Sequence, residues 1–305
     1  MKKFFAAVLA LTMALSLAAC GSKKEEAPAA PAASTPAASA PAASAPASSE
    51  KEAGWWKSEL KTINAGKLTM ATSPDFAPYE FYAIDAKGDP QLAGFDIALA
   101  QYIADYLGLE LEIIPMDFDG TILELQNKNV DIGMAGYSPD PARADAMDFS
   151  DIYISGGQSF VCLQSNKDKF PDLASANKPE YQIGAQIGSI QAGLAKENTP
   201  DADIIEMTKV TDIIAELITG KMDGAFIETM VAESYAKNYP ELCLALDVPY
   251  DAEGSVVGVS KGNEALLAGV NEAIAAALAD GSMADFVAEA NELASGNIYE
   301  GLLEG

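Results

Sequence analysis

The sequence predicts an α/β protein built from two similar lobes. Short apolar runs typical of strands alternate with helix-like runs from residue 67 onward, and this alternation favours sheets whose strands are mostly parallel. A helix, a tight turn with a lysine and an aspartate precede a buried strand twice, at residues 122–136 and at residues 214–228. The chain after residue 54 is long enough for one large domain or for two of ~120 residues each, and the repeat favours two lobes.

The elements of the first half follow from apolar spacing and from the residues that end each run. Lys67–Thr72 is a strand-like apolar run that ends at a proline-containing turn. Residues 94–107 carry apolar side chains at helical spacing, and Gly108 ends the helix that they predict. Asp140 before Pro141 is typical of a helix start, since proline is favoured at the first helical position. We also expect a strand at Glu110–Pro115, a helix at Asp119–Gln126 and a strand at Val130–Ala135.

The second half repeats this alternation. Gly188-Ser189 opens a helix, and Thr211–Thr219 is a helix with one apolar side. Ligands bind beyond the carboxyl ends of strands in open α/β sheets, so the ends of the two repeats, near Gly136 and Glu228, indicate a cleft between the lobes. We further expect strands at Ser159–Gln164, Gln182–Ala185, Asp223–Ile227, Leu242–Val248 and Ser255–Val259, and helices at Glu264–Ala279 and Met283–Leu293.

The N-terminal segment is typical of an exported protein. Two lysines and a short apolar run precede Leu17-Ala18-Ala19-Cys20, which predicts a signal peptide over residues 1–19. The end of this run resembles a lipobox, in which Cys20 carries the lipid that attaches the protein outside the cell membrane. The alternative is a transmembrane anchor, although the apolar run is shorter than the ~20 residues that a span needs. Residues 20–53 are rich in Ala, Pro and Ser and predict an unfolded spacer of up to ~100 Å.

Composition excludes several classes of function. The chain carries 19 basic and 45 acidic residues and no histidine. Nucleic acid is excluded as a partner because phosphate binding needs a basic face. Without histidine the chain lacks the usual general base and has no Cys/His cluster for zinc, so we expect neither a metal nor a cofactor. Cys162 and Cys243 each lie in a strand-like run, and both a disulfide and two buried free thiols fit this pattern.

Arg143 is the candidate binding residue of the first repeat. It would lie in the first turn of a short helix after Pro141, where the helix dipole disfavours a cation. An anionic ligand resolves this conflict, because the free N–H groups and the guanidinium would converge on one carboxylate. The alternative is a surface ion pair with Asp140, Asp145 or Asp148, and spacing alone does not separate the two interpretations.

The motifs of residues 94–158 resemble those of the bacterial extracellular solute-binding proteins of family 3, the polar amino-acid receptors of ABC importers. The resemblance extends in order over the whole globular region, and the many motifs at matching spacing make it specific. It implies a periplasmic-binding-protein-like type II fold, with two α/β lobes joined by two hinge strands. The matching segments are Phe76-Ala77-Pro78-Tyr79-Glu80-Phe81, Gly94-Phe95-Asp96-Ile97, Asp117-Phe118-Asp119-Gly120, Leu125–Asp131, Ala135-Gly136, Arg143, Asp148-Phe149-Ser150-Asp151 with Tyr153, Gly188-Ser189 and Gly220–Asp223.

The same resemblance implies the boundaries of the lobes and the roles of the site residues. Lobe 1 would comprise residues 54–156 and 253–305, and lobe 2 residues 157–252, with hinges near Tyr153–Gly157 and Ala252–Val256. Arg143 would bind the ligand's α-carboxylate together with Ser138, Ser189 and Ile190. Gly136 and Ser138 would face the α-amino group, Glu228 would pair with it, and Phe76 and Phe118 would stack on the ligand. Core positions remain an alternative for both phenylalanines, a solvated strand end for Glu228, and either a pocket wall or an ordinary loop position for Tyr137.

Three departures from the family pattern bear on the ligand. Glu228 stands where aspartate is usual, Ser73 where several members carry an aspartate that reads the ligand side chain, and Ile190 where a small or hydroxyl residue is common. Gln186 is the remaining candidate for contact with the side chain. Since no further acid or base is evident in the pocket, a neutral or polar amino acid is expected.

The resemblance therefore predicts a receptor for a free amino acid that acts as a monomer, docks on an ABC permease and is held at the membrane by its lipid. Two other classes remain as alternatives. One is an enzyme on the same scaffold, such as a dehydratase of cyclic amino-acid precursors, and the other is a sensor module that signals its ligand state to a partner.

Overall fold

The computed structural model describes residue 52, residues 54–252 and residues 254–296. The predicted signal peptide, Cys20 and nearly all of the predicted spacer lie outside the described residues. Within the described part, every helix falls short of the length and apolarity that a membrane span requires.

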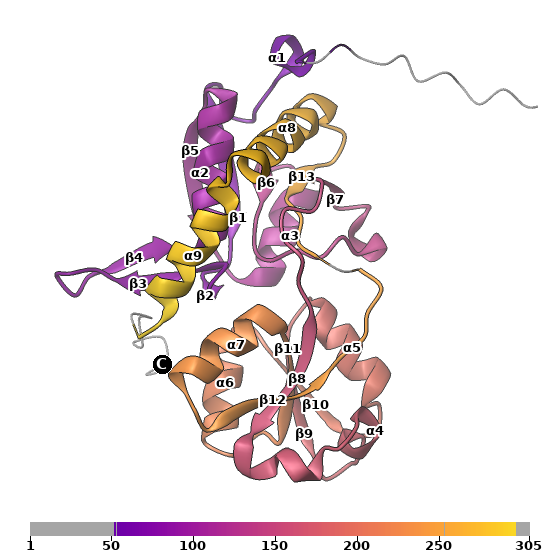
Figure 1. The fold of residues 1–305 in the computed structure, drawn as a ribbon. Helices are drawn as coiled ribbons and strands as arrows, with labels where there is room; N and C mark the ends of the chain where they lie inside the picture. Colours follow the sequence, from indigo (N-terminus) through magenta and orange to yellow (C-terminus); the bar gives the residue numbers. More distant parts are fainter. Residues whose placement is uncertain (1–51, 53, 253, 297–305) are drawn as a thin grey trace, which may run out of the picture. The chain divides into compact units, whose positions relative to one another are not determined.

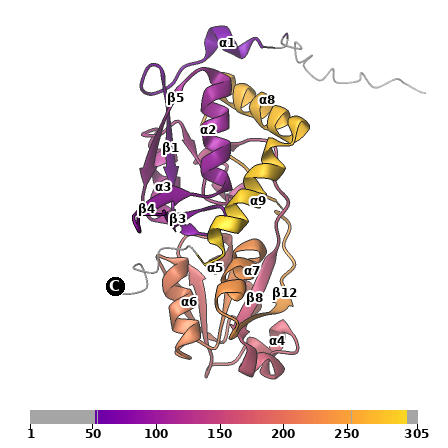
Figure 2. The ribbon, with the colours of Figure 1, turned by 60° about the vertical axis from the view of Figure 1, so that its left-hand side comes forward.

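The first lobe is built on a five-stranded sheet in the order β5-β1-β6-β13-β7 (Figure 1). α3 packs on one face through Phe118 and Leu125, while α2 and α8 cover the other face through residues such as Ile103 and Leu266. α9 packs beside α2 and α8, as Figures 1 and 2 show. The elements are β1 (Lys67–Thr72), α2 (Phe95–Leu107), β5 (Glu110–Pro115), α3 (Phe118–Gln126), β6 (Ile132–Gly133), β7 (Met147–Phe149), β13 (Gly258–Ser260), α8 (Glu264–Asp280) and α9 (Ser282–Ala294), with the short α1 (Trp56–Glu59) packed on α8.

The second lobe repeats this design in the order β10-β9-β11-β8-β12. α6 and α7 contribute apolar side chains to the cluster that also contains α2, whereas α4 and α5 pack in a separate cluster around Phe160 and Phe226. The elements are β8 (Gln158–Leu163), the 3-10 helix η2 (Gln164–Lys169), α4 (Leu173–Ala176), β9 (Gln182–Gln186), α5 (Ile190–Asn198), β10 (Asp203–Met207), α6 (Val210–Ile218), β11 (Gly224–Glu228), α7 (Thr229–Asn238) and β12 (Leu242–Asp247).

Both sheets are mixed, which corrects the expectation of mostly parallel sheets. In the first sheet β1 runs parallel to β5 and β6, but β13 is antiparallel to β6 and β7. In the second sheet β9 runs parallel to β10 and β11, but β8 is antiparallel to β11 and β12. The physical reason is that β8 and β13 directly follow the segments that pass between the lobes, so each enters its sheet from the opposite direction to the strands of the βαβ units.

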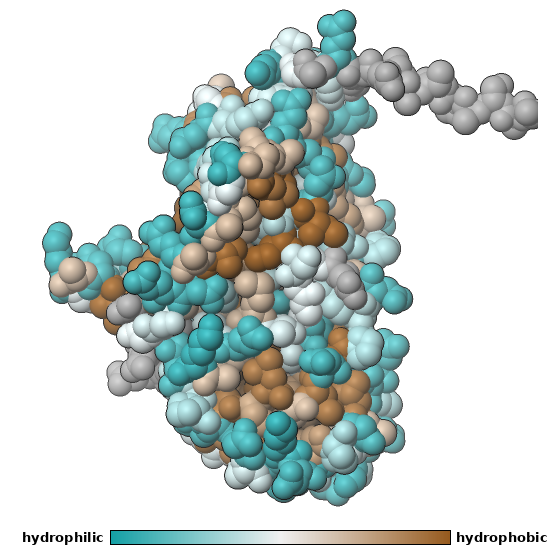
Figure 3. Space-filling view, viewed as in Figure 1, coloured by the Kyte–Doolittle hydropathy of each residue, from teal (hydrophilic) through white to brown (hydrophobic). Residues whose placement is uncertain are grey.

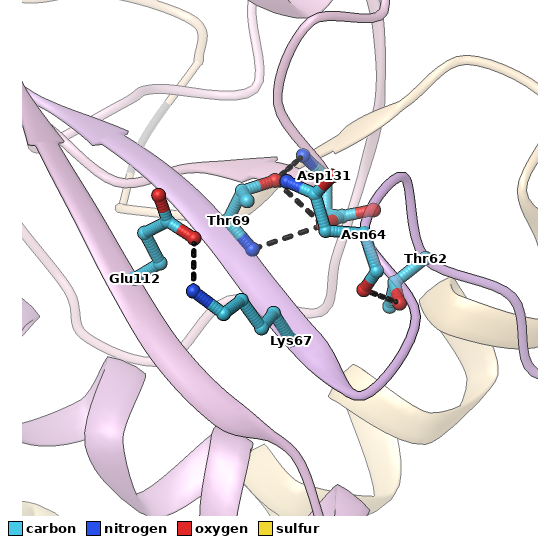
Figure 4. A network of polar contacts seen from close by, with 6 residues as sticks. All are labelled: Thr62, Asn64, Lys67, Thr69, Glu112 and Asp131. Carbon is cyan, nitrogen blue, oxygen red and sulfur yellow. Dashed lines mark hydrogen bonds and ion pairs between the residues drawn. The ribbon is translucent and has the colours of Figure 1, made fainter.

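The aspartate of each internal repeat fastens its strand to the neighbouring one. Asp131 accepts a hydrogen bond from the backbone N–H of Thr69 at 2.9 Å, and Thr69 Oγ1 donates to the same carboxylate (Figure 4). Asp131 also accepts from the backbone N–H of Ile63 at 2.8 Å. Asp223 accepts from the N–H of Gln182 at 3.0 Å, where β9 begins. These repeated aspartates are therefore structural, and they explain why helix, turn and aspartate recur together before β6 and β11.

A small sheet of β2 (Asp75–Phe76), β3 (Glu80–Ile84) and β4 (Pro90–Ala93) extends the first lobe. Gly94 follows it at φ 122°, and a Cβ there would lie 2.1 Å from the carbonyl oxygen of Tyr79. Only glycine fits this close approach, which brings β3 against the start of α2.

Two segments connect the lobes, which confirms the predicted fold class. The N–H of Tyr153 donates to the carbonyl of Ser255 at 3.0 Å, and the N–H of Ser255 donates to the carbonyl of Ile154 at 2.8 Å. The residues at which each lobe begins and ends stay a prediction.

The face in Figure 3 carries apolar side chains mainly in its central part and hydrophilic ones at its periphery.

Candidate functional site

Arg143 is the only arginine in the sequence, and its guanidinium is buried. The 3-10 helix η1 (Pro141–Arg143) positions it, and the side chain of Asp140 caps this helix by accepting from Ala142 N at 2.8 Å. The guanidinium carbon lies 5.4 Å from the ring centre of Phe118 and 5.8 Å from that of Tyr137. Such cation–π contacts hold the group in place without neutralising its charge.

Arg143 has no carboxylate partner among the described residues. The ion pairs of that part of the chain join lysines to acids, and Asp148, an expected surface partner of Arg143, is paired with Lys261 at 2.6 Å. Burial lowers the pKa of Arg143, and nearby Tyr137 and Asp140 oppose this shift. A buried guanidinium with no counterion is costly, so this site favours an anion supplied by a ligand.

The N-terminus of α5 lies beside this guanidinium. Arg143 donates to the carbonyl oxygen of Gly188 at 3.2 Å, and Gly188 directly precedes Ser189, the N-cap of α5. Ser189 Oγ accepts from Ala192 N at 3.2 Å and donates to the carbonyl of Gln186 at 2.7 Å, so its hydroxyl fixes the helix start. Ile190 is the first helical residue, where backbone N–H groups lack acceptors within the helix and favour an anion.

Aromatic rings line the site from the first lobe. Phe76 is 7% exposed and packs on Gly136, whose φ is 57° and where a Cβ would lie 2.6 Å from the ring. Phe118 is also 7% exposed and lies under the guanidinium. Tyr137 is fully buried, and its hydroxyl donates to Thr121 Oγ1, so this tyrosine supports Phe118 and Arg143 from the core side. Ser138 is buried in the same loop.

Glu228 is the last residue of β11 and caps α7. Its Oε2 accepts from Val231 N at 2.9 Å, and its Oε1 accepts from Gly157 N at 3.4 Å, next to the connection between the lobes. A Cβ on Gly156 would lie 2.9 Å from Oε1 and 3.4 Å from the hydroxyl oxygen of Tyr79. Burial raises the pKa of Glu228 to about 7 against these hydrogen bonds. A cation beside this carboxylate would favour its ionised form.

Gln186 is engaged in a contact between the lobes. Its Nε2 donates to the carbonyl of Thr208 at 3.0 Å and to Asp75 Oδ2 at 3.3 Å. Asp75 also accepts from Ser73 Oγ at 2.8 Å and from the N–H of Val210, the first residue of α6. Burial raises the pKa of Asp75 to about 6. Sequence reasoning missed Asp75, although its place directly before Phe76 was an available signal.

Asp96 is a second residue that the sequence reasoning missed as part of the site. Its Oδ2 accepts from Gly136 N at 3.1 Å, and its Oδ1 accepts from the hydroxyl of Tyr153 at 2.7 Å. Burial raises the pKa of Asp96 to about 6 and that of nearby Glu80 well above its usual range. Through its two hydrogen bonds, Asp96 connects the loop at Gly136 to the first connecting segment.

The structure brings together Arg143 with Phe118, Tyr137 and the start of α5, and separately joins Gln186 to Asp75. Glu228 lies at the connecting segment, beside Tyr79. Among the described residues there is no group of three or more His, Cys, Asp or Glu side chains suited to a metal ion.

Two α/β lobes are joined by two strands, and an arginine without a carboxylate partner among the described residues faces a helix start of the opposite lobe. These features define a solute-binding protein of the periplasmic-binding-protein type II class. The chain belongs to the bacterial extracellular solute-binding proteins, family 3, whose family model matches residues 68–289.

Known relatives agree with this membership. The chain is similar to the arginine-binding extracellular protein ArtP of Bacillus subtilis (strain 168), with 32% identity over 65% of this chain and 76% of ArtP. It is also similar to the cyclohexadienyl dehydratase of Pseudomonas aeruginosa PAO1, with 26% identity over 60% of this chain and 67% of that enzyme. Among solved structures, the amino acid ABC transporter substrate-binding protein AbpA of Streptococcus pneumoniae bound to L-arginine matches with a TM-score of 0.73 and 28% identity, covering 76% of this chain and 97% of AbpA.

Proposed function

We propose that this protein captures a free amino acid outside the cell and delivers it to the permease of an ABC importer. The observation that carries the proposal is Arg143, a buried guanidinium that lacks a carboxylate among the described residues and lies beside the start of α5. Relatives named for amino-acid binding support the ligand class.

The proposed mechanism is a clamp for both charges of a zwitterion. The ligand's α-carboxylate accepts two parallel hydrogen bonds from Arg143 and further ones from the N–H groups at Ser189 and Ile190. Its ammonium pairs with Glu228 and donates to acceptors near Gly136 and Ser138. A zwitterion that leaves water must find both charges paired, or its desolvation cancels the gain from binding.

Closure of the lobes would follow from the same contacts. Arg143 belongs to one lobe and the start of α5 to the other, so a carboxylate bound by both favours the closed arrangement. We propose hinge motion at Tyr153–Gly157 and Ala252–Val256, docking of the closed monomer on the permease, and attachment to the membrane through a lipid on Cys20.

Two observations bear on the side chain of the ligand, and they favour different classes of amino acid. Ser73 and Ile190 carry no charge and favour a neutral or polar ligand. Asp75 and Asp117 line a cavity of about 190 Å³ together with apolar residues and Lys209, and they favour a cationic side chain such as that of arginine. Asp75 already accepts hydrogen bonds from Ser73, Gln186 and the N–H of Val210, and the charge of nearby Lys209 opposes a second cation, so a ligand screen decides between the two classes.

A thermal-shift screen of the twenty amino acids with cystine, ornithine and citrulline tests the function. A binder at 100-fold its dissociation constant adds ~2.7 kcal/mol of stability, which a melting curve detects. Comparing the melting temperatures with arginine and lysine, which are cationic, to those with citrulline and glutamine, which are neutral, separates the two side-chain classes. A screen in which no amino acid raises the melting temperature contradicts the proposal.

Arg143→Ala should abolish ligand binding while the fold is retained, because the α-carboxylate loses its bidentate partner. Calorimetry with the best ligand of the screen measures the loss. Lys261→Ala is the matched control, since it removes a cation that is paired with Asp148 on the surface. Equal affinities of Arg143→Ala and the unchanged protein would refute the role of Arg143.

A dehydratase is the second candidate function, favoured by the similarity to cyclohexadienyl dehydratase. Such an enzyme needs an acid or base directed at the substrate carbon, and Glu228 is the candidate for that role. Incubation of the purified protein with arogenate and prephenate decides between the two, because turnover of either would establish the enzyme.

A further inference from the structure

Cys162 and Cys243 face each other across two neighbouring strands. The antiparallel register of β8 and β12 pairs them directly, and their Sγ atoms lie 3.7 Å apart as free thiols. Directly opposite residues of an antiparallel pair have Cα atoms about 4.5–5.5 Å apart, within the range that a disulfide spans. A small rotation of the two side chains is therefore enough to bring the sulfurs to bonding distance.

The surroundings leave few other roles for the two thiols. Both are buried in the apolar cluster of the second lobe, with Phe160, Phe170 and Phe226. The described residues contain no group of three metal-ligating side chains, and the sequence has no histidine, so a metal site does not explain the pair. Burial raises the pKa of the Cys162 thiol to about 12, which keeps it unreactive once the lobe has folded.

We propose that Cys162 and Cys243 form a disulfide that joins β8 to β12 in the exported protein. Members of the family are extracellular proteins, and disulfides form and persist in that environment. Because the folded thiols are buried, the bond would form while β8 and β12 are pairing, before the cluster closes around them.

The oxidant is a disulfide of the thiol–disulfide oxidoreductase class. The thiolate of one cysteine attacks this disulfide, forms a mixed disulfide and releases the oxidant's first thiolate. The thiolate of the other cysteine then attacks the mixed disulfide, completes the Cys162–Cys243 bond and releases the second thiolate. The two protons lost by the cysteines protonate the two leaving thiolates, so the oxidant is reduced by two electrons and leaves as a dithiol.

The bond would fasten the two strands that continue into the connections between the lobes. β8 begins directly after Gly157, and β12 ends directly before Val248, whose N–H donates to the carbonyl of Gln158 at 2.8 Å. The cysteines are 81 positions apart in sequence, so the disulfide closes a long loop and restricts the unfolded chain. We therefore expect higher stability and an unchanged ligand affinity.

The test uses the full chain with Cys20→Ser, so that only these two thiols remain. After oxidative refolding with reduced and oxidised glutathione, we expect a mass lower by two hydrogens, a single cross-linked peptide pair and no thiol available to alkylation in denaturant. Dithiothreitol should reverse these changes and lower the melting temperature by several degrees.

The control is the triple variant that carries Cys162→Ala and Cys243→Ala together with Cys20→Ser. Its melting temperature should not respond to dithiothreitol. If that variant does not fold, the mass and alkylation measurements on the parent chain still decide. Two alkylatable thiols after oxidative refolding would overturn the proposal. That result would leave the amino-acid receptor untouched, because its ligand contacts involve neither cysteine.

Discussion

At the scale of single residues, the charges that we propose to act on a ligand differ from those that hold the fold. Asp131, Asp148 and Asp223 are bound to strand residues or to a lysine, whereas buried Arg143 has no carboxylate partner in the part of the chain that the structure describes. Glu228 caps α7 and lies beside the connection between the lobes, so its proposed role toward the ligand is combined with a structural one.

Glu228→Gln should weaken ligand binding by ~2 kcal/mol or more, because the ammonium then lacks a charged partner. Calorimetry on the variant and on the unchanged protein measures the difference. Glu228→Asp is the matched control, because it keeps the negative charge at this position. An affinity that does not change would assign the ammonium to another acid, and Asp117, which lines the same cavity as Asp75, is the first to examine.

At the scale of helices and strands, the sequence predicted the βαβ units well. β1 and β5 were predicted with their observed bounds, and the helices at α2, α3, α6 and α8 were placed within one residue at both ends. These elements have regular apolar spacing and strong end signals such as Gly108, which takes the left-handed conformation after α2.

The missed elements lack such signals. β2, β3 and β4 form a small sheet whose first two strands are almost wholly buried, so no alternation of apolar and polar residues marks them. The strand β7, the edge strand β10 and the helix α7 were missed as well. In α7 the buried side carries few large apolar residues beyond Val231 and Tyr235. Asp75 was overlooked for a different reason, because its contacts with Gln186 and α6 come from residues more than a hundred positions away.

Gly94→Ala should destabilise the protein by roughly 3 kcal/mol or more, because its backbone conformation suits only glycine and a Cβ would collide with the carbonyl of Tyr79. Urea unfolding measures the change in the free energy of unfolding. Gly193→Ala is the matched control. Gly193 lies within α5 with open space around it, so alanine there should raise the free energy of unfolding by about 0.5–1 kcal/mol through its higher helix propensity. A loss at Gly193 as large as that at Gly94 would show that helix propensity and steric fit do not explain these positions.

At the scale of the whole molecule, the free energy of unfolding should fall as the pH rises from about 4 to about 7. Burial raises the pKa of Asp75 and of Asp96 to about 6 and that of Glu228 to about 7, so these groups bind more protons in the folded than in the unfolded chain over this range. Their contribution to stability is complete below their unfolded pKa values and is lost as the pH passes their folded ones. Asp148 and Asp280 have lowered pKa values and oppose this trend only at more acidic pH.

Urea unfolding at several pH values between 4.5 and 8, without ligand, measures this dependence. We expect a decrease of roughly 2 kcal/mol or more across the range, since each pKa unit of difference between folded and unfolded states corresponds to about 1.4 kcal/mol. Glu228→Gln removes one of the groups with a raised pKa and should flatten the curve between pH 5 and 7. Stability that rises over the same range would mean that the acids of the site are ionised and paired in the folded protein. A bound amino acid should shift the curve in that direction, because its ammonium favours the ionised form of Glu228.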